Sequence, residues 1–404
     1  MEEKKIGRRN FLKTMALSAV SIGAANASIA APASLEVAAG ESSGSAPMPV
    51  RELGATGVKV PILFLGTSQS LDPVYDKVMH LCFKEGVTGL DTALSYGWGS
   101  SHRAIANFTK QIGDRKKIWI TSKSGSRTPE GLLADIDKCR EELETDYLDL
   151  YLMHGINEVR MLDKAFLQVG DQVRKSGKTR FFGFSCHDGN VVELMNTAAQ
   201  VGGIDAILFR YNFRQYGDRE LNTAIDACDK AGIGLLAMKT MGSVPSDIEK
   251  VVEFQSQNFT LGQAKLKSVW ADKRIDSVVS EMSSVKEARQ NIEAAKSEKP
   301  LKAEEIHQLN RLAALTAGYA CNGCSYLCES AVDKKVAIAA PLRYLMYYEC
   351  YGKQERAREL YNAIPREVRR FEGVDLEKAA AVCPQGINIA ARLSKAKSLL
   401  EGPV

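Results

Sequence analysis

The sequence predicts an α/β fold, a (β/α)8 TIM barrel followed by a smaller, mainly helical C-terminal domain. From residue 50 onward, short apolar segments alternate with amphipathic segments of helical period. The 404 residues also exceed the roughly 250 of a usual barrel domain, so a second domain is expected. We therefore predict a barrel over residues 50–300 and a separate domain over residues 301–404.

Residues 1–45 have the features of an export signal and a linker. A charged start precedes an uncharged run rich in Ala, Ser and Ile, with small-residue cleavage sites. Residues 8–13, RRNFLK, resemble the twin-arginine (Tat) signal that exports folded proteins, although Gly7 stands where Ser or Thr is usual. We expect export by the Tat machinery to a periplasmic or extracytoplasmic location, with no stable membrane span after cleavage. A general secretory signal or a membrane anchor is the alternative.

The net charge is +4, and the first 30 residues account for most of it, with five Lys or Arg against two Glu. The remainder is nearly neutral. This balance gives no support for a nucleic-acid partner.

Eight apolar segments predict the strands, and amphipathic segments such as 129–144 and 218–232 predict helices between them. An open doubly wound sheet would show the same alternation. Residues 66–70, after the first strand, lack the Gly-x-Gly-x-x-Gly pattern of that fold, so a barrel is favoured. The predicted strands are residues 62–66, 89–93, 117–123, 148–154, 179–186, 205–213, 233–240 and 276–282.

Four polar residues follow or end the second, third and fourth predicted strands: Asp91, Tyr96, Lys123 and His154. Catalytic groups of such barrels lie at these strand ends, so we expect the four to share one site. Reduction of a carbonyl needs a proton donor, and the ammonium of Lys123 is expected to lower the pKa of the Tyr96 phenol. Asp91 would hold the ammonium, and His154 would hydrogen-bond the substrate oxygen. Each residue alone also has a structural explanation, as a helix cap, a loop aromatic, a surface charge or a core histidine.

The segments that carry these residues, among them LDTALSYG, TSKSG, DYLDLYLMHGI and KSGKTRFFGFSCHD, resemble the aldo-keto reductase family over about residues 50–300. The resemblance implies an enzyme that transfers hydride between NADH or NADPH and an aldehyde or ketone. It implies Tyr96 as general acid, supported by Asp91, Lys123 and His154, and no metal in that step.

The resemblance also implies a nicotinamide site at Ser185 and Cys186, where the family has a Ser-Asn pair. Leu208 stands where the family has Gln. Around the adenosine, Asn291 matches the family, whereas Glu287 replaces an Arg.

Glu281 likewise replaces a Lys or Gly of the family. Carboxylates repel a 2′-phosphate, so the hypothesis is a preference for NADH over NADPH. The alternative is that Glu281 and Glu287 only cap and solvate the next helix.

Four cysteines of the C-terminal region predict a metal centre. Cys321, Cys324 and Cys328 form a C-x2-C-x3-C turn, and Cys383 precedes Pro384 as in the last part of bacterial ferredoxin motifs. We predict one [4Fe-4S] cluster on these four thiolates. A four-cysteine zinc site and disulfides are the alternatives.

Cys350 is a spare thiol or an alternative ligand, and Cys82, Cys139 and Cys228 are expected to be ordinary buried thiols. Cys186 is expected to be the same, unless it takes part near the nicotinamide. Residues 340–364, rich in aromatics and of helical type, are expected to pack over the cluster or the barrel, with partner docking as the alternative. This part, including LRYLMYY, resembles aldo-keto reductases with an iron-sulfur tail.

Together these features predict an exported reductase of small carbonyl compounds whose cluster serves electron transfer with a redox partner protein or stabilises the fold. Two alternatives stay open. One is an electron-transfer or binding protein without nicotinamide turnover, and the other is a reductase with a structural zinc tail.

Overall fold

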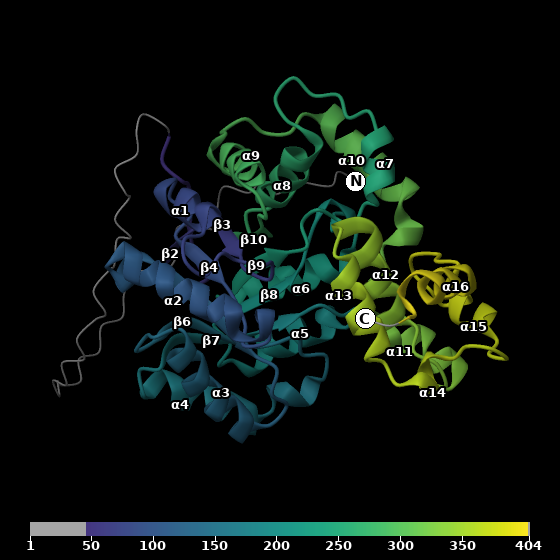
Figure 1. Ribbon diagram of the computed structural model, residues 1–404, viewed down its shortest axis with the longest axis horizontal. Helices are drawn as coiled ribbons and strands as arrows, with labels where there is room; N and C mark the ends of the chain where they lie inside the picture. The colour runs from purple at the N-terminus through teal and green to yellow at the C-terminus, as the bar shows by residue number, and fades with distance from the viewer. Residues whose placement is uncertain (1–45, 403–404) are drawn as a thin grey trace, which may run out of the picture. The chain divides into compact units, whose positions relative to one another are not determined.

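The computed structural model describes residues 46–402 and contains a closed barrel of parallel strands (Figure 1). The predicted signal and linker, residues 1–45, lie outside the described residues. The strand order is β10-β3-β4-β5-β6-β7-β8-β9, which confirms the predicted barrel. In chain order the barrel strands are β3 (Leu63–Gly66), β4 (Gly89–Asp91), β5 (Trp119–Ser124), β6 (Leu148–Met153), β7 (Thr179–Cys186), β8 (Ala206–Arg210), β9 (Gly234–Met238) and β10 (Ser277–Glu281).

Each strand is buried on both faces, as β6 illustrates. Leu150 and Leu152 pack inside the barrel with Phe64. Tyr151, between them, points outward and its hydroxyl donates to the carbonyl of Leu132 in the helix after β5, 2.8 Å away. This alternation explains why the strands are continuous apolar runs in the sequence.

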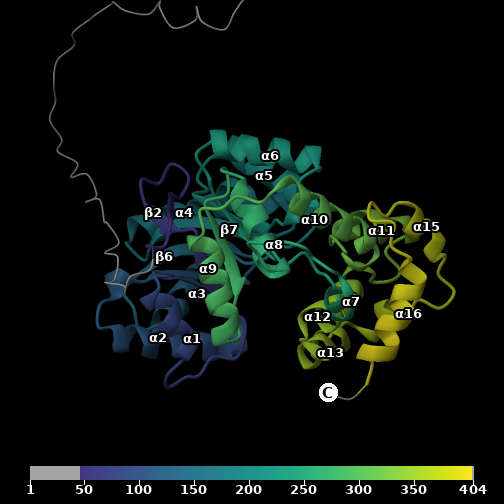
Figure 2. The ribbon, with the colours of Figure 1, turned by 90° about the horizontal axis from the view of Figure 1, so that it is seen from above.

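Helices surround the strands, as Figure 2 shows from above. Several begin at a side chain that accepts backbone N–H groups, for example Asp163 before α4 and Thr260 before α8. Those after the barrel strands are α1 (Lys77–Lys84), α2 (Ser100–Ile112), α3 (Pro129–Glu142), α4 (Lys164–Lys175), α5 (Val191–Val201), α6 (Arg219–Lys230), α7 (Ser246–Val251), α8 (Leu261–Ala271) and α9 (Val285–Lys296).

A short antiparallel hairpin, β1 (Val50–Glu52) and β2 (Lys59–Pro61), precedes the barrel. The guanidinium of Arg51 donates to the carbonyl oxygens of Trp270 at 2.7 Å and Asp272 at 3.0 Å, just before β10. The hairpin therefore covers the N-terminal end of the barrel, opposite the predicted site.

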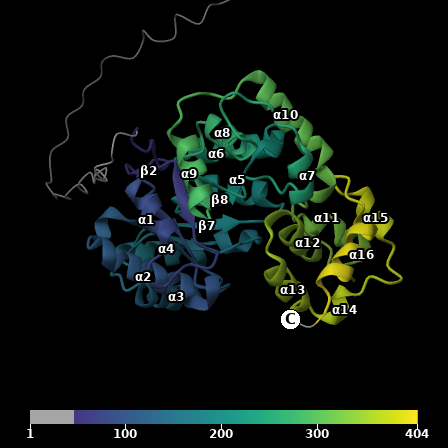
Figure 3. The same cartoon turned by 45° about the horizontal axis from the view of Figure 1, so that its top comes forward.

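The C-terminal region is helical, as predicted. Leu309 of α10 (Ala303–Leu315) packs with Phe213 and Phe259 of the barrel unit. The helices that follow gather into one group with its own apolar core, including Leu342 and Leu393 (Figure 3). They are α11 (Ser325–Cys328), α12 (Ala339–Tyr351), α13 (Gln354–Asn362), α14 (Arg366–Arg369), α15 (Leu376–Ala381) and α16 (Ile389–Leu400).

Within residues 46–402, no helix combines the length and apolar character needed to cross a bilayer.

Candidate active site

The four residues predicted to share a site all lie at the C-terminal ends of β4, β5 and β6. Asp91 is the last residue of β4, Lys123 is the last but one residue of β5 and His154 follows β6 directly. Tyr96 begins a 3₁₀ helix (Tyr96–Gly99), and Gly97 just after it has a φ of 54°, a left-handed conformation that suits glycine. This turn directs the tyrosine back over the strand ends.

Contacts among the four side chains join them into one group. The ammonium of Lys123 donates to Asp91 at 2.6 Å and to the carbonyl oxygen of Thr92 at 2.7 Å. The same nitrogen lies 5.1 Å from the centroid of the Tyr96 ring. The rings of Tyr96 and His154 meet edge to face, with centroids 5.8 Å apart.

The electrostatics of Tyr96 differ from the sequence expectation. Burial, followed by the charges of Asp91, Tyr347 and Glu281, raises the pKa of Tyr96 well above its ordinary value. The expected lowering by Lys123 is absent because Asp91 balances the ammonium and the phenolate would be poorly solvated. Tyr96 is therefore a protonated phenol at neutral pH.

The two histidines beside Tyr96 are neutral at neutral pH. Burial, with the charges of Lys123 and Arg127, lowers the pKa of His154 to about 3. His187, whose ring centroid is 6.1 Å from that of His154, has a pKa lowered well below its ordinary value, again mainly by burial. A neutral imidazole keeps one N–H, which can donate to a substrate oxygen.

Ser185 and Cys186 end β7 beside this group. The hydroxyl oxygen of Ser185 accepts from the N–H of Gly155 at 2.8 Å, which leaves the hydroxyl hydrogen for another acceptor. Cys186 is buried and its pKa is raised to about 12, chiefly by burial. Leu208 packs in the apolar barrel interior, so this position offers no polar contact.

The predicted adenosine residues lie at α9. Asn291 is buried and its side-chain amide donates to the hydroxyl of Ser280 at 3.1 Å. Glu287 is exposed, and its carboxylate accepts from the N–H of Ser283 at 2.7 Å. Glu287 thus stabilises the start of α9, and its charge stays open to solvent.

Glu281 does not cap α9. Its carboxylate accepts from the hydroxyl of Ser68 at 2.9 Å and from the ammonium of Lys353, beyond α12, at 2.6 Å. Its charge is therefore balanced by the C-terminal region and is not free to act on a cofactor phosphate by itself.

Helix α12 lies against the barrel beside the site, so the aromatic-rich segment packs onto the barrel as expected. Tyr347 of α12 reaches Lys239, whose ammonium is 4.8 Å from the Tyr347 ring centroid. Lys353 follows α12, and its contact with Glu281 was not predicted from the sequence. Three polar contacts fix α12 and its end: Arg343 with Asp188 at 3.1 Å, Tyr351 with Ser243 at 2.7 Å and Lys353 with Glu281 at 2.6 Å.

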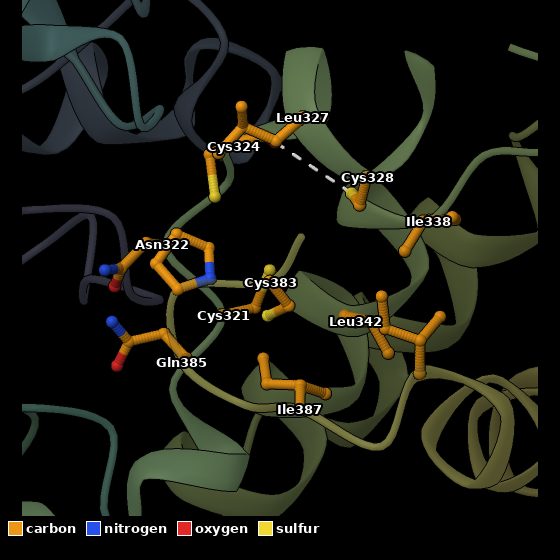
Figure 4. Close-up of a pocket in the computed structure, with 12 residues that line it drawn as sticks. Cys321, Asn322, Cys324, Leu327, Cys328, Ile338, Leu342, Cys383, Gln385 and Ile387 are labelled. Atoms are coloured by element: carbon orange, nitrogen blue, oxygen red, sulfur yellow. Dashed lines mark hydrogen bonds between the residues drawn. The ribbon is translucent and has the colours of Figure 1, made fainter. Parts of the chain in front are cut away.

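Cys321, Cys324, Cys328 and Cys383 line one pocket with about 330 Å³ of empty space, including space open to solvent (Figure 4). The thiol of Cys328 donates to the carbonyl of Cys324 at 3.9 Å. Among residues 46–402, no group of three or more His, Cys, Asp or Glu side chains has the arrangement of a metal-ion site. The remaining lining is largely apolar and includes Leu327, Ile338, Leu342, Ile387 and Ile389.

All nine cysteines lie in the described part of the chain and carry free thiols. Cys350 does not line the pocket, and burial raises its pKa to about 12. The single cysteines outside the C-terminal region are buried, as expected for ordinary thiols: Cys82, Cys139, Cys186 and Cys228.

The cysteine turn also contacts the barrel. The guanidinium of Arg210, at the end of β8, donates to the carbonyl oxygens of Cys321 at 2.8 Å and of Asn322. It donates as well to the carbonyl of His187 at 3.4 Å. Arg210 thus joins the pocket of four cysteines to the loop after β7.

Comparisons with known proteins agree with this geometry. A model of the aldo/keto reductase family matches residues 65–314, which extends past the predicted barrel end into α10. An aldo/keto reductase of Synechocystis sp. is 36% identical over 123 residues, 30% of this chain and 37% of the relative. L-galactose dehydrogenase of Arabidopsis thaliana is 25% identical over 283 residues, 61% of this chain and 87% of the relative.

A solved aldo-keto reductase from Bacillus halodurans, in its holo form, has the same fold, with a TM-score of 0.57 and 21% identity. That likeness covers 66% of this chain and 96% of the solved one. The family match and relatives named as reductases support the prediction of an NAD(P)H-dependent oxidoreductase. With more than half of its residues matched by the family model, the chain belongs to the aldo/keto reductase family.

Proposed function

We propose that the protein reduces an aldehyde or ketone with a nicotinamide cofactor, and that Tyr96 gives the proton to the carbonyl oxygen. The observation that carries this proposal is the ion pair of Lys123 with Asp91 at 2.6 Å, directly beside the Tyr96 ring. A neutral phenol, an ammonium held by a carboxylate and a neutral imidazole suit a reaction in which an oxygen gains negative charge.

The cofactor would supply the hydride when bound. Ser185 fits its amide because the hydroxyl hydrogen is available to a carbonyl oxygen. Asn291 and Glu287 would lie at its adenosine end, as the family resemblance implies. NADH is the expected partner, because the exposed Glu287 carboxylate repels a 2′-phosphate.

Each residue of the site has a distinct part in the proton transfer. Tyr96 donates its hydroxyl proton as charge develops on the substrate oxygen, and the Lys123 ammonium stabilises the phenolate that remains. Asp91 holds Lys123 in place through the 2.6 Å contact. His154 is neutral and donates an N–H to the same substrate oxygen.

Turnover of simple aldehydes with NADH and NADPH tests the proposal, together with the variant Tyr96→Phe. Loss of aldehyde reduction in that variant would support it. Cofactor binding without turnover in the unaltered protein would instead favour a binding or electron-transfer protein, the second candidate. Leu208 motivates that candidate, because it removes a polar contact that the resemblance implies for the nicotinamide.

We also propose that Cys321, Cys324, Cys328 and Cys383 bind one [4Fe-4S] cluster. Four thiols from two segments line one largely apolar pocket, and this donor set suits a group that takes four thiolates. A zinc ion held by the same four thiolates, each about 2.3 Å from the metal, is the alternative. When bound, the cluster would exchange single electrons with a redox partner protein or stabilise the helices around it.

The iron-sulfur hypothesis and the zinc hypothesis predict different metals in the purified protein. Protein purified without air should be brown, hold about four iron and four sulfide per chain, and give an EPR signal after reduction. Zinc in place of iron, with no visible absorption, would reject the cluster and favour the structural zinc site.

Export through the Tat machinery completes the proposal, with a periplasmic or extracytoplasmic location. Residues 8–13 support it, and so does the need to assemble a cluster before translocation, which requires export of a folded chain. Replacing Arg8 and Arg9 by Lys should keep the full-length protein inside the cell, and unchanged export would reject this route.

A further inference from the structure

Three donors between α12 and the strand ends have unused hydrogen-bonding capacity. Nδ1 of His187 and Nε of Arg343 are buried, and neither has a hydrogen-bond partner among residues 46–402. The ammonium of Lys239 contacts Tyr347 and keeps further hydrogens that it can donate to another acceptor. Buried polar atoms without partners are rare in folded proteins, and a bound water, ion or ligand commonly satisfies them.

Lys239 differs from Arg343 and Lys353 in having no carboxylate partner. Arg343 pairs with Asp188 at 3.1 Å and Lys353 pairs with Glu281 at 2.6 Å. Among residues 46–402, no Asp or Glu forms an ion pair with Lys239. Its ammonium faces the rings of Tyr347 and Tyr351 instead, with centroids 4.8 and 5.6 Å away.

The backbone of Lys239 is also unusual. This residue follows β9 at the C-terminal end of the barrel and has a φ of 57°. Left-handed φ is uncommon in residues other than glycine, and such residues cluster at functional sites. The fold therefore holds the backbone of a charged residue in a costly conformation, at the end of the barrel where substrates of such barrels bind.

These groups share one place beside the four catalytic side chains. After burial, the charge of Lys239 is the largest cause of the lowered pKa of His187, and His154 and Arg343 act on it too. The ring of His187 is 6.1 Å from that of His154, which in turn lies against Tyr96. A ligand atom accepting from His187 would thus lie next to a carbonyl held by Tyr96 and His154.

We propose that Lys239, His187 and Tyr347 form an anion-binding subsite, so that the preferred substrate is an aldehyde or ketone that also carries a carboxylate. Lys239 supplies the charge, while the phenol of Tyr347 and the imidazole of His187 donate hydrogen bonds. The C-terminal domain thereby contributes Tyr347 to substrate recognition. This inference rests on the proposed carbonyl reduction.

Chain-matched substrates test the subsite. Rates are measured for 4-oxobutanoate and for butanal, which differ in the carboxylate, with the full-length protein and saturating cofactor. We expect kcat/KM to be at least about tenfold higher for 4-oxobutanoate, because a charged hydrogen bond in a partly buried site supplies that much binding. Equal values for the two aldehydes would overturn the inference.

Substitutions assign the preference to Lys239. Lys239→Gln should lower kcat/KM for 4-oxobutanoate about tenfold, mainly through KM, and change the value for butanal less than about twofold. Lys239→Arg keeps the charge and should retain most of the preference. Lys116→Gln is the matched control, because Lys116 is exposed before β5 at the opposite end of the barrel.

The pyrophosphate of the cofactor is the other source of an anion. Fluorescence titration with NADH separates the two, because a substrate subsite predicts the same NADH affinity in Lys239→Gln as in the unaltered protein. Weaker NADH binding with an unchanged preference between the aldehydes would overturn the inference in favour of the pyrophosphate.

Failure of the proposed function would be visible separately. If neither aldehyde is reduced, calorimetric binding of 4-hydroxybutanoate decides the matter. Binding that Lys239→Gln weakens about tenfold supports the subsite even then, and absence of binding to the unaltered protein overturns it.

Discussion

Gly189 and Cys324 approach so closely that a Cβ on residue 189 would fall 2.5 Å from the Cβ of Cys324 and 2.8 Å from its Cα. Gly189 lies in the loop after β7, and Cys324 is the middle cysteine of the C-x2-C-x3-C turn. The backbone of the loop after the predicted nicotinamide residues therefore packs against the backbone of the turn that carries the predicted cluster ligands.

Gly189→Ala should separate these two segments, since the added methyl group needs a shift of main-chain atoms. We expect faster amide hydrogen exchange in residues 321–328 and a lower iron content after anaerobic purification. Gly217→Ala is the control, because a Cβ there meets nothing within 4 Å. If both variants exchange and bind iron alike, the close approach is not a constraint on the cysteine turn.

Tyr96→Phe should lower kcat for aldehyde reduction by at least about a hundredfold, because it removes the proton donor. Circular dichroism should be unchanged. Tyr75→Phe, at an exposed tyrosine stacked on His80, is the matched control and should keep full activity. An active Tyr96→Phe protein would require a different acid.

The stability should depend on pH through His154. Its pKa is lowered to about 3 in the folded state, mainly by burial, whereas the pKa of a histidine in an unfolded chain is about 6.5. As the pH falls below about 6.5, the unfolded state takes up the proton first. The stabilisation from this residue is therefore fully present above that pH and is lost as the pH falls toward 3.

Urea unfolding at pH 7 and pH 5 measures this effect. His154→Asn should show a smaller loss of unfolding free energy between the two pH values, by about 1–2 kcal/mol. His307→Asn, at an exposed histidine of α10, should show the same loss of unfolding free energy between pH 7 and pH 5 as the unaltered protein. A His154→Asn protein with the same loss would mean that His154 is protonated in the folded state.

Glu287→Arg should strengthen NADPH binding about tenfold and leave NADH binding nearly unchanged, since it replaces a repelling charge by an attracting one at the predicted adenosine end. Fluorescence titration with both dinucleotides gives the two affinities. Glu298→Arg adds the same charge at an exposed position beyond α9 and should change neither. Tighter binding of NADPH than NADH by the unaltered protein would contradict the expected preference.

Cys328→Ser should lose most of the iron, because the pocket would keep three thiolates of four. Cys350→Ser should retain it, since Cys350 does not line the pocket. Iron and sulfide analysis of the two variants, purified without air, distinguishes them. Iron loss in Cys350→Ser alone would make Cys350 the fourth ligand.

The barrel could be predicted because each strand is a local pattern. The segment 148–154, for example, is β6 (Leu148–Met153), and its end places His154 beside Lys123 on the neighbouring strand β5. Strand ends of one barrel meet at one face, so the grouping of the four side chains followed from the topology.

The pKa of Tyr96 could not be predicted in the same way. Proximity of Lys123 is visible in the strand pattern, whereas burial and the balancing charge of Asp91 depend on the packed structure. The partner of Glu281 could not be predicted for a related reason. Its partner Lys353 is 72 residues away in the chain, and no spacing in the sequence links the two.

The ion pairs of α12 give the C-terminal region a second role, as a counter-charge for the barrel. Without Arg343 and Lys353, the carboxylates of Asp188 and Glu281 would face the cofactor and substrate side uncompensated. A chain that ended at Leu315 would thus lack the two cations that pair with these carboxylates. Under the anion subsite that we propose, shortening the chain would weaken the preference for a carboxylate-bearing substrate even if the barrel folded unaltered.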